Sequence, residues 1–170
     1  MEDPIISSVV TDTSESKVTI VGVPDRPGIS AALFEPLAAA NVNVDMIVQN
    51  TSRDGFTDIS FTMPKADMGT AESIVSRVAA EIGAKGVDHD AEIGKISLVG
   101  AGMKTSPGIA AKMFRTLADE GVNIAMISTS TIRISVVTAA ADLERAARAL
   151  HTAFGLDSGE AYSAPLPERK

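Results

Sequence analysis

The chain has 170 residues, which suits one large domain or two small domains of about 70 to 80 residues each, and its hydrophobic content of 45% is sufficient for a buried core. The aromatic content is only 4% and Trp is absent, so the core must consist mainly of Ala, Val, Ile, Leu and Met. The net charge of −7 argues against nucleic acid or an anionic membrane as a partner, and the absence of Cys excludes disulfides, thiolate nucleophiles and Cys-ligated metals.

The N-terminal residues Met1–Pro4 are acidic and precede no long apolar segment, so we do not expect a secretory signal peptide. No apolar run approaches the roughly 20 residues that a membrane-spanning helix needs. The sequence therefore predicts a cytoplasmic protein.

The first half of the chain contains β-branched runs, runs of alternating apolar and polar residues, and two segments with apolar residues at helical spacing. Pro27-Gly28 marks the place where the first strand turns into a helix, because Pro pre-sets φ and Gly lets the backbone approach another group closely. Asn41 is a residue type that ends such a helix. The predicted elements are a strand over 18–23, a helix over 29–40, strands over 42–48 and 57–63, a helix over 67–82 and a weak strand over 85–90.

The second half of the chain repeats the first half. From the Pro-Gly pair onward the two halves are shifted by 80 residues, so that Pro27 corresponds to Pro107, Gly28 to Gly108 and Met46 to Met126. A coincidence over this length is improbable, and we infer a duplicated domain. The second set of elements is a strand over 96–100, a helix over 109–120, strands over 122–127 and 132–137, a helix over 140–154 and a candidate fourth strand over 160–164.

This order predicts an α+β fold of two tandem ferredoxin-like βαββαβ domains, each an antiparallel sheet with helices on one face. The open edge of such a sheet favours pairing with a second copy, so a homodimer is expected. The predicted divisions are an N-terminal strand over 1–16 that joins the second domain, a first domain over 17–93, a second domain over 94–164 and a disordered tail over 165–170.

The sequence offers no catalytic or metal site. We find no nucleophile with an adjacent base and no carboxylate pair at a plausible spacing. The run Gly100–Thr105 is superficially like a phosphate-binding loop but lacks its spacing, and His89 and His151 do not have the spacing of metal ligands. We therefore predict a protein that is not an enzyme by itself and needs no cofactor or metal.

Five stretches, one of them the Gln49-Asn50 pair, carry a resemblance to a known family. The pattern Val-Gly-x-Pro-Asp-x-Pro-Gly at residues 21–28, followed by a helix and by Val42–Met46, resembles an ACT domain, the amino-acid-sensing module of metabolic enzymes. Lys95–Met103 and Ile127–Val136 are similar to the C-terminal regulatory half of bacterial aspartate kinase. The resemblance extends over residues 4–155.

In some bacteria this regulatory half is also made separately, as the β-subunit of an α2β2 enzyme. The resemblance implies a non-catalytic regulatory subunit that partners the catalytic α-subunit. It also implies feedback control of the aspartate pathway, in which threonine, usually in concert with lysine, inhibits the first step.

The resemblance also implies a threonine site between two chains. Asp25 supplies a carboxylate for the α-ammonium group, and the amides that open the helix at residues 28–30 suit the α-carboxylate. The residues of this site are Asp25, Gly28, Ile29, Ser30 and Gln49 of the first domain, facing Asn123 and Ile124 of the second domain of a partner chain.

A second effector site, for lysine, is expected at Ser52, Thr105, Ser130 and Thr131. The family usually has Glu after Ser128-Thr129-Ser130, where this chain has Thr131. If that carboxylate helps to hold a lysine ammonium group, sensitivity to lysine is weakened in this protein.

Plainer interpretations stay open at this point. The Pro-Gly pairs also fit ordinary turns, Asp25 a solvated turn residue, and Gln49 and Asn123 ordinary polar strand ends. Two other functions compete with the regulatory subunit. One is a free-standing ACT-domain amino-acid sensor that regulates another enzyme, and the other is a dimerisation module without a ligand.

Overall fold

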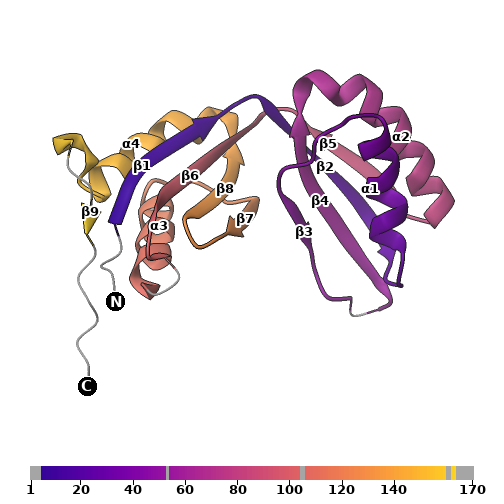
Figure 1. The fold of residues 1–170 in the computed structure, drawn as a ribbon, viewed down its shortest axis with the longest axis horizontal. Helices are drawn as coiled ribbons and strands as arrows, with labels where there is room; N and C mark the ends of the chain where they lie inside the picture. The colour runs from indigo at the N-terminus through magenta and orange to yellow at the C-terminus, as the bar shows by residue number, and fades with distance from the viewer. Residues whose placement is uncertain (1–4, 53, 104–105, 160–161, 164–170) are drawn as a thin grey trace. The chain divides into compact units, whose positions relative to one another are not determined.

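The computed structural model describes residues 5–52, 54–103, 106–159 and 162–163, and the chain divides into two compact units (Figure 1). The N-terminal unit spans Ser14–Glu92. The C-terminal unit begins at Ile93 and also includes the start of the chain up to Thr13. Among the described residues, no helix combines the length and the apolar character needed to cross a membrane.

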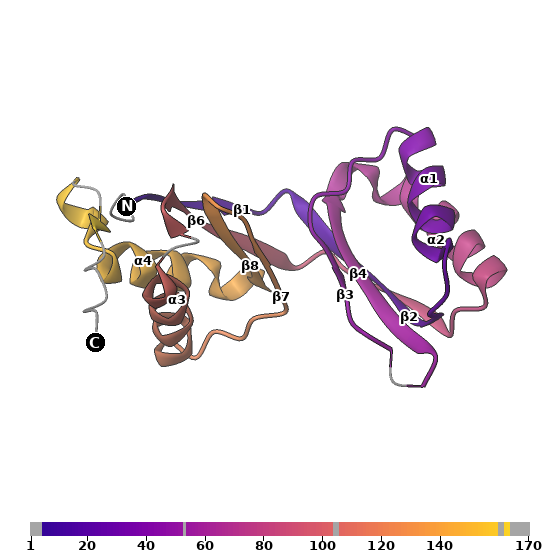
Figure 2. The same cartoon turned by 60° about the horizontal axis from the view of Figure 1, so that its bottom comes forward.

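The N-terminal unit is a four-stranded antiparallel sheet in the order β3-β4-β2-β5, with both helices on the same face (Figure 2). Alternate residues of the two central strands, such as Ile20 and Ile59, point toward the helices and pack on Leu33, Leu37 and Val75. Its elements are β2 (Glu15–Pro24), α1 (Ile29–Ala39), β3 (Ile47–Gln49), β4 (Phe56–Pro64), a short 3₁₀ helix (Lys65–Asp67), α2 (Met68–Ile82) and β5 (Gly86–Asp90).

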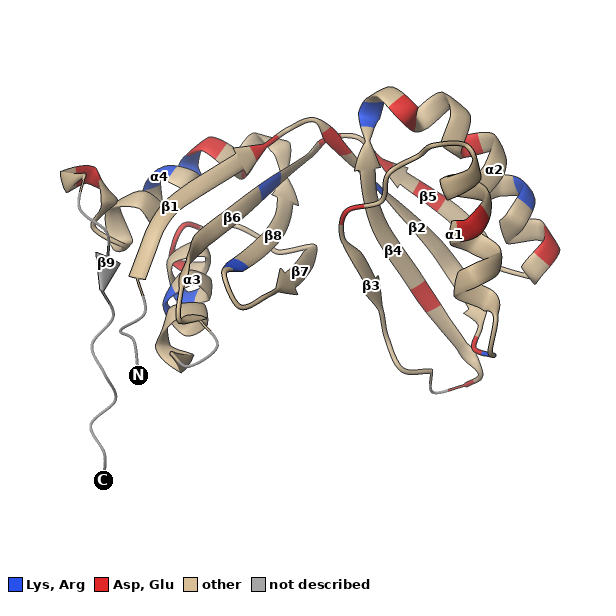
Figure 3. Ribbon diagram, viewed as in Figure 1, with Lys and Arg blue, Asp and Glu red and all other residues tan. Residues whose placement is uncertain are grey.

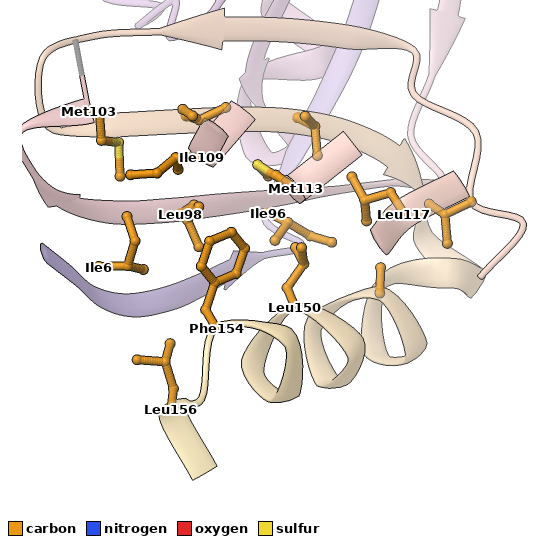
Figure 4. Packing of buried hydrophobic residues seen from close by; sticks show 14 of the residues in the cluster. Ile6, Ile96, Leu98, Met103, Ile109, Met113, Leu117, Leu150, Phe154 and Leu156 are labelled. Atoms are coloured by element: carbon orange, nitrogen blue, oxygen red, sulfur yellow. The ribbon is translucent and has the colours of Figure 1, made fainter. Parts of the chain in front are cut away.

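The C-terminal unit repeats this layout with the strand order β7-β8-β6-β1-β9. Figure 4 shows Leu150 and Phe154, at the end of α4, pointing toward Ile96 and Leu98 of β6 in the buried core. Its elements are β1 (Ile5–Asp12), β6 (Ile93–Ala101), α3 (Pro107–Asp119), β7 (Met126–Thr129), β8 (Arg133–Ala139), a 3₁₀ turn (Ala140–Asp142), α4 (Leu143–Ala153), a second 3₁₀ turn (Leu156–Ser158) and β9 (Tyr162–Ser163).

The α+β class with repeated βαββαβ-like units is confirmed, but the fourth strand differs between the units. In the N-terminal unit β5 lies beside β2, as the chain order predicts. In the C-terminal unit the equivalent place beside β6 is taken by β1, whose residues pair antiparallel with Lys95–Ala101. Within the predicted fourth strand at 160–164, the described residues Tyr162 and Ser163 pair only with Ile6 and Ile5, on the far side of β1.

The strands predicted over 42–48 and 122–127 are shorter than expected, since β3 begins at Ile47 and β7 at Met126. The residues before β3 first close the preceding helix. Asn41 has a φ of 60°, and the Val42 N–H donates to the Leu37 carbonyl at 2.9 Å, which is the Schellman pattern of a helix end. The apolar alternation therefore reflects the burial of Val42 in the core, whereas ladder pairing starts only where β4 runs alongside.

The predicted helices over 67–82 and 140–154 each begin with a 3₁₀ turn, so that the α-helical part starts at Met68 and at Leu143. Acidic and basic residues are interspersed along α4 (Figure 3). Arg145 lies 2.8 Å from Asp142, and Arg148 pairs with Glu144. This helix therefore presents no basic face for nucleic acid.

Candidate functional site

The loop between β2 and α1 holds the residues predicted for the α-ammonium and α-carboxylate groups. The Asp25 N–H donates to the Gly55 carbonyl at 2.9 Å, which ties this loop to the loop between β3 and β4. Gly28 precedes α1 with a φ of 91°, a left-handed conformation that favours glycine. A Cβ on Gly28 would meet no atom within 4 Å, so the space beside this backbone is open.

The first turn of α1 contacts the edge strand β3. The Ser30 hydroxyl donates to Gln49 Oε1 at 3.4 Å. Gln49 is paired with Ile59, a core residue, so its side chain lies on the helix-bearing side of the sheet. The structure thus brings together Gly28, Ser30 and Gln49 at the start of α1, all three exposed.

This arrangement suits a small zwitterion. The first amides of a helix have no intrahelical acceptors and attract an anion. Asp25 supplies a carboxylate three residues before Gly28, and the Gln49 amide can both donate and accept a hydrogen bond. Asp25 is exposed, and its carboxylate has no ion pair with another described residue.

The residues predicted to complete the site lie in the other unit. Asn123 and Ile124 form part of the connection between α3 and β7, with Asn123 exposed and Ile124 partly buried against the core. Their placement in a partner chain stays a prediction.

The predicted lysine residues are not gathered into one place within a unit. Ser52 belongs to the N-terminal unit, and its buried Oγ has no partner among the described residues. Ser130 and Thr131 lie between β7 and β8, where the Ser130 N–H donates to the Arg133 carbonyl at 2.8 Å. Thr105 lies outside the described residues.

A cleft that the sequence did not indicate lies elsewhere in the N-terminal unit, lined by Phe56, Asp58 and Lys85 among others. Its sequence signal is weak. The alternation along β4 places Asp58 on the face opposite the core residue Ile59, but nothing in the sequence brings Lys85 to it.

The described residues contain no group of His, Asp and Glu side chains arranged to hold a metal ion. His89 lies in β5 and is exposed, whereas His151 of α4 contacts Asp157, with Nδ1 and Oδ1 2.7 Å apart.

Models of the ACT domain match residues 17–83 and 96–154. A solved structure of aspartokinase alpha and beta subunits has a chain 44% identical to this one, with a TM-score of 0.83, covering 89% of this chain and 99% of that chain. The regulatory subunit of aspartate kinase from Thermus thermophilus is 38% identical with a TM-score of 0.84, covering 88% and 98%. The chain belongs to the family of aspartate kinase regulatory subunits.

The resemblance read from the sequence is thereby confirmed, and the two units are tandem ACT domains. The aspartate kinase of Pseudomonas fluorescens is 50% identical over 158 residues, which are 93% of this chain. The same stretch is only 38% of that kinase, so this chain spans little more than a third of the length of such relatives.

Proposed function

We propose that this chain is a non-catalytic regulatory subunit of aspartate kinase that binds threonine beside the start of α1 and mediates feedback inhibition. The observation that carries this proposal is the contact of Ser30 with Gln49 next to the open, left-handed backbone of Gly28. These residues offer partners for each polar group of threonine.

The ligand groups are assigned by their chemistry. The α-carboxylate lies at the amides that open α1, where the helix dipole favours an anion. The α-ammonium group lies at the Asp25 carboxylate. The Gln49 amide, with Ser30 beside it, hydrogen-bonds the ligand hydroxyl, which a non-polar analogue lacks.

The site is completed by a second copy of the chain. β3 is an edge strand of only three residues, and Ile47 on it is 51% exposed, which supports pairing of this edge with another ACT domain. In the resulting homodimer, main-chain groups of Asn123 and Ile124 from the partner chain face the ligand. The catalytic α-subunit joins this dimer in an α2β2 assembly.

Inhibition follows from differential affinity. Threonine contacts two chains in the associated arrangement and loses part of these contacts when the arrangement loosens, so it shifts the equilibrium toward the associated state. A coupling free energy of about 1–3 kcal/mol is typical of such systems and corresponds to several-fold inhibition.

Lysine sensitivity is expected to be weak because Thr131 replaces the family's Glu. Calorimetric titration of lysine into the wild type and Thr131→Glu should show tighter binding to the variant. Equal affinities would remove Thr131 from the lysine site.

The central experiment is a thermal melt of the chain with and without L-threonine, using D-threonine, lysine and methionine for comparison. At about 100 times its dissociation constant a ligand adds about 2.7 kcal/mol to the free energy of unfolding. Each kcal/mol moves the midpoint of a chain of this size by roughly 2–4 °C. We expect a stereospecific rise of several degrees with L-threonine.

Two variants locate the effect. Gln49→Ala should lose most of the rise, whereas Thr129→Ala, the corresponding position in the second ACT domain, should keep it. A rise of equal size in Gln49→Ala would contradict the site. Copurification with an aspartate kinase α-subunit would separate this function from a free-standing sensor.

A further inference from the structure

The loop between β3 and β4 contains the one Asp-Gly sequence of the chain, Asp54-Gly55, and no Asn of the chain is followed by Gly. Both residues are exposed and lie outside any helix or strand, since β3 ends at Gln49 and β4 begins at Phe56 (Figure 1). An Asp side chain closes most readily into a cyclic imide when Gly follows it, because Gly has no side chain to hinder its backbone nitrogen. Asp54 is therefore the residue of this chain best suited to that reaction.

The reaction joins two groups of the same chain. The backbone nitrogen of Gly55 attacks Cγ of Asp54, and a C–N bond forms while the nitrogen loses its proton and the carboxyl group its hydroxyl, together as water. The product is a five-membered succinimide. Water then adds to either ring carbonyl: cleavage of the new C–N bond restores Asp54, whereas cleavage of the original peptide bond gives isoaspartate, in which the backbone runs through Cβ and Cγ. The net change is an isomerisation, which needs no reactant other than water.

The structure holds neither reacting group in a competing contact. The Gly55 N–H donates to no described residue, and the Asp54 carboxylate has no ion pair with one. Gly55 has a φ of 81°, and a Cβ on it would meet no atom within 4 Å, so the space beside this backbone is open. The nearby carboxylate of Asp58, by contrast, is anchored, because its Oδ1 accepts the Gly22 N–H at 2.9 Å. Closure of the ring at Asp54 therefore has no hydrogen bond or ion pair of the described residues to break.

The carbonyl of Gly55 ties this loop to the loop that precedes α1. It accepts the Asp25 N–H at 2.9 Å, and the next residue, Phe56, is already paired with Pro24 in the ladder of β2 and β4. Isoaspartate inserts one methylene group into the backbone directly before Gly55. Because β4 fixes the chain on the other side of Gly55, the added carbon displaces the Gly55 carbonyl from the Asp25 N–H.

We propose that Asp54 is a site of spontaneous isoaspartate formation, and that the modified chain binds its effector more weakly because the loop of Asp25 is released. The first part stands on the Asp-Gly sequence and the open backbone alone. The second part rests on the proposed function, which assigns the α-ammonium group of threonine to Asp25. Isomerisation thus reduces feedback inhibition as the protein ages, without removing a charge, since isoaspartate keeps one carboxylate.

The test is an incubation of the purified full chain at pH 7 and 37 °C, followed by digestion, chromatography and mass spectrometry. An isoaspartyl peptide has the mass of its parent but elutes separately. We expect isoaspartate to accumulate at Asp54 severalfold faster than at Asp157, which precedes Ser158 in a 3₁₀ turn, and less than tenfold slower than in a synthetic peptide of residues 50–58. A rate at Asp54 no higher than at Asp157, or tenfold or more below that of the peptide, would overturn the site.

Two variants with the same exchange locate the reaction. Asp54→Glu keeps the charge but would have to close a six-membered ring, which forms far more slowly, so the peptide that contains this position should stay unmodified. Asp119→Glu lies in α3 of the other unit and should isomerise at Asp54 as the wild type does. An unchanged isoaspartyl signal in Asp54→Glu would assign that signal to Asp58 in the same peptide and overturn the site.

Calorimetric titration of L-threonine into fresh and aged samples tests the consequence. The isoaspartyl fraction of the aged wild type should bind threonine about two- to tenfold more weakly, which is the size expected for one lost hydrogen bond, whereas aged Asp54→Glu should bind as its fresh sample does. Unchanged affinity in the aged wild type would overturn the coupling to the effector site. If the fresh wild type does not bind threonine, the proposed threonine site is refuted. The amide NMR signal of Asp25, which should move on ageing in the wild type but not in Asp54→Glu, then decides whether the loop is released.

Discussion

The two ACT domains use the same Pro-Gly pair in different ways. In the N-terminal domain Gly28 lies outside α1 in a left-handed conformation, and the helix begins after it. In the C-terminal domain Pro107 is already the first residue of α3, and Gly108 lies within its first turn with an ordinary φ. An identical dipeptide thus gives a left-handed residue before the helix in one domain and a regular helix start in the other.

The side chains near the Pro-Gly pair also differ between the two domains. Ser30 and Gln49 contact each other in the N-terminal domain, whereas the corresponding residues 80 positions later are Ala110 and Thr129. The hydroxyl-to-amide contact therefore has no counterpart in the C-terminal domain. The two domains therefore share the fold, but this polar contact is present only in the N-terminal one.

The glycine near the end of the first strand of each repeat, Gly22 in β2 and Gly100 in β6, has a similar role in the two domains. Gly22 makes room for the stem of Lys85, which leads into β5. Gly100 makes room for the backbone of β1, because a Cβ there would lie 2.1 Å from the Ile5 carbonyl oxygen. Since β5 and β1 occupy equivalent places in their sheets, both glycines accommodate the fourth strand.

The largest effect on stability is expected from alanine at these two glycines. Gly100→Ala would force apart two paired strands, and we expect a loss of about 3 kcal/mol or more in the free energy of unfolding. Gly22→Ala should cost less, about 1–2 kcal/mol, since it meets a flexible Lys stem and a strained φ. Urea denaturation followed by circular dichroism measures both, and a larger loss for Gly22→Ala would invert the comparison.

A buried hydroxyl pair is expected to give the next largest effect. Ser97 and Ser135 Oγ atoms are 2.7 Å apart and buried, whereas the equivalent Thr19 and Ser60 are 2.8 Å apart and only partly buried. Ser97→Ala leaves the Ser135 hydroxyl buried without this partner, at a cost of about 1–3 kcal/mol. Thr19→Ala should cost less because water can reach Ser60. Equal losses in urea denaturation would show that burial does not distinguish the pairs.

Alanine at the two Pro-Gly glycines should change the free energy of unfolding in opposite directions. Gly28→Ala places a side chain in a left-handed conformation and is expected to cost about 1–2 kcal/mol. Gly108→Ala adds a methyl group that meets no atom within 4 Å at a helical position, and should stabilise the chain by about 0.5–1 kcal/mol. Thermal melts compare the two, and destabilisation by Gly108→Ala would show that its role extends beyond starting the helix.

The sequence predicted the elements whose signals are local. Helical spacing and the helix-ending residue Asn41 located α1, and the same spacing in the repeat located α3, because a helix is set by neighbours three and four residues away. The order of these locally predicted elements, repeated twice, also predicted the fold class. The contact of Ser30 with Gln49 joins residues that the family resemblance had already placed in one site.

The sequence predicted that the N-terminal strand joins the second domain, but it did not rank this strand against residues 160–164 for the place beside β6. The structure shows that β1 takes that place and that Tyr162 and Ser163 pair on its far side. The cleft at Lys85 was missed because it depends on a bulge in β2, and a bulge is visible only in the pairing register.

The smallest expected effect concerns the ends of the second helices. α2 ends at Ile82 with Gly83 as its C-cap, and the chain continues into β5. α4 is instead followed by a 3₁₀ turn, in which Asp157 contacts His151 of the helix. The hydrogen bond from His151, together with one from Thr152, lowers the pKa of Asp157 below its ordinary value of 3.8. Because the folded-state pKa is depressed, this contribution to stability is present above the unfolded-state pKa and is lost as the pH falls through the folded-state pKa.

The side chains of His151 and Asp157 are 43% and 60% exposed, so the effect is small and screened by salt. Urea midpoints between pH 2 and pH 6, followed by the fluorescence of Tyr162, the only tyrosine, report on the C-terminal domain. Asp157→Asn should lower the midpoint at pH 6 and flatten its fall in acid. Asp119→Asn is the control, because it removes a carboxylate from α3 in the same domain. Its midpoint should fall in acid as that of the wild type does, since the contribution of Asp157 is retained. If the midpoint of Asp157→Asn falls in acid in parallel with that of the wild type, the contact between α4 and the turn adds nothing to acid stability.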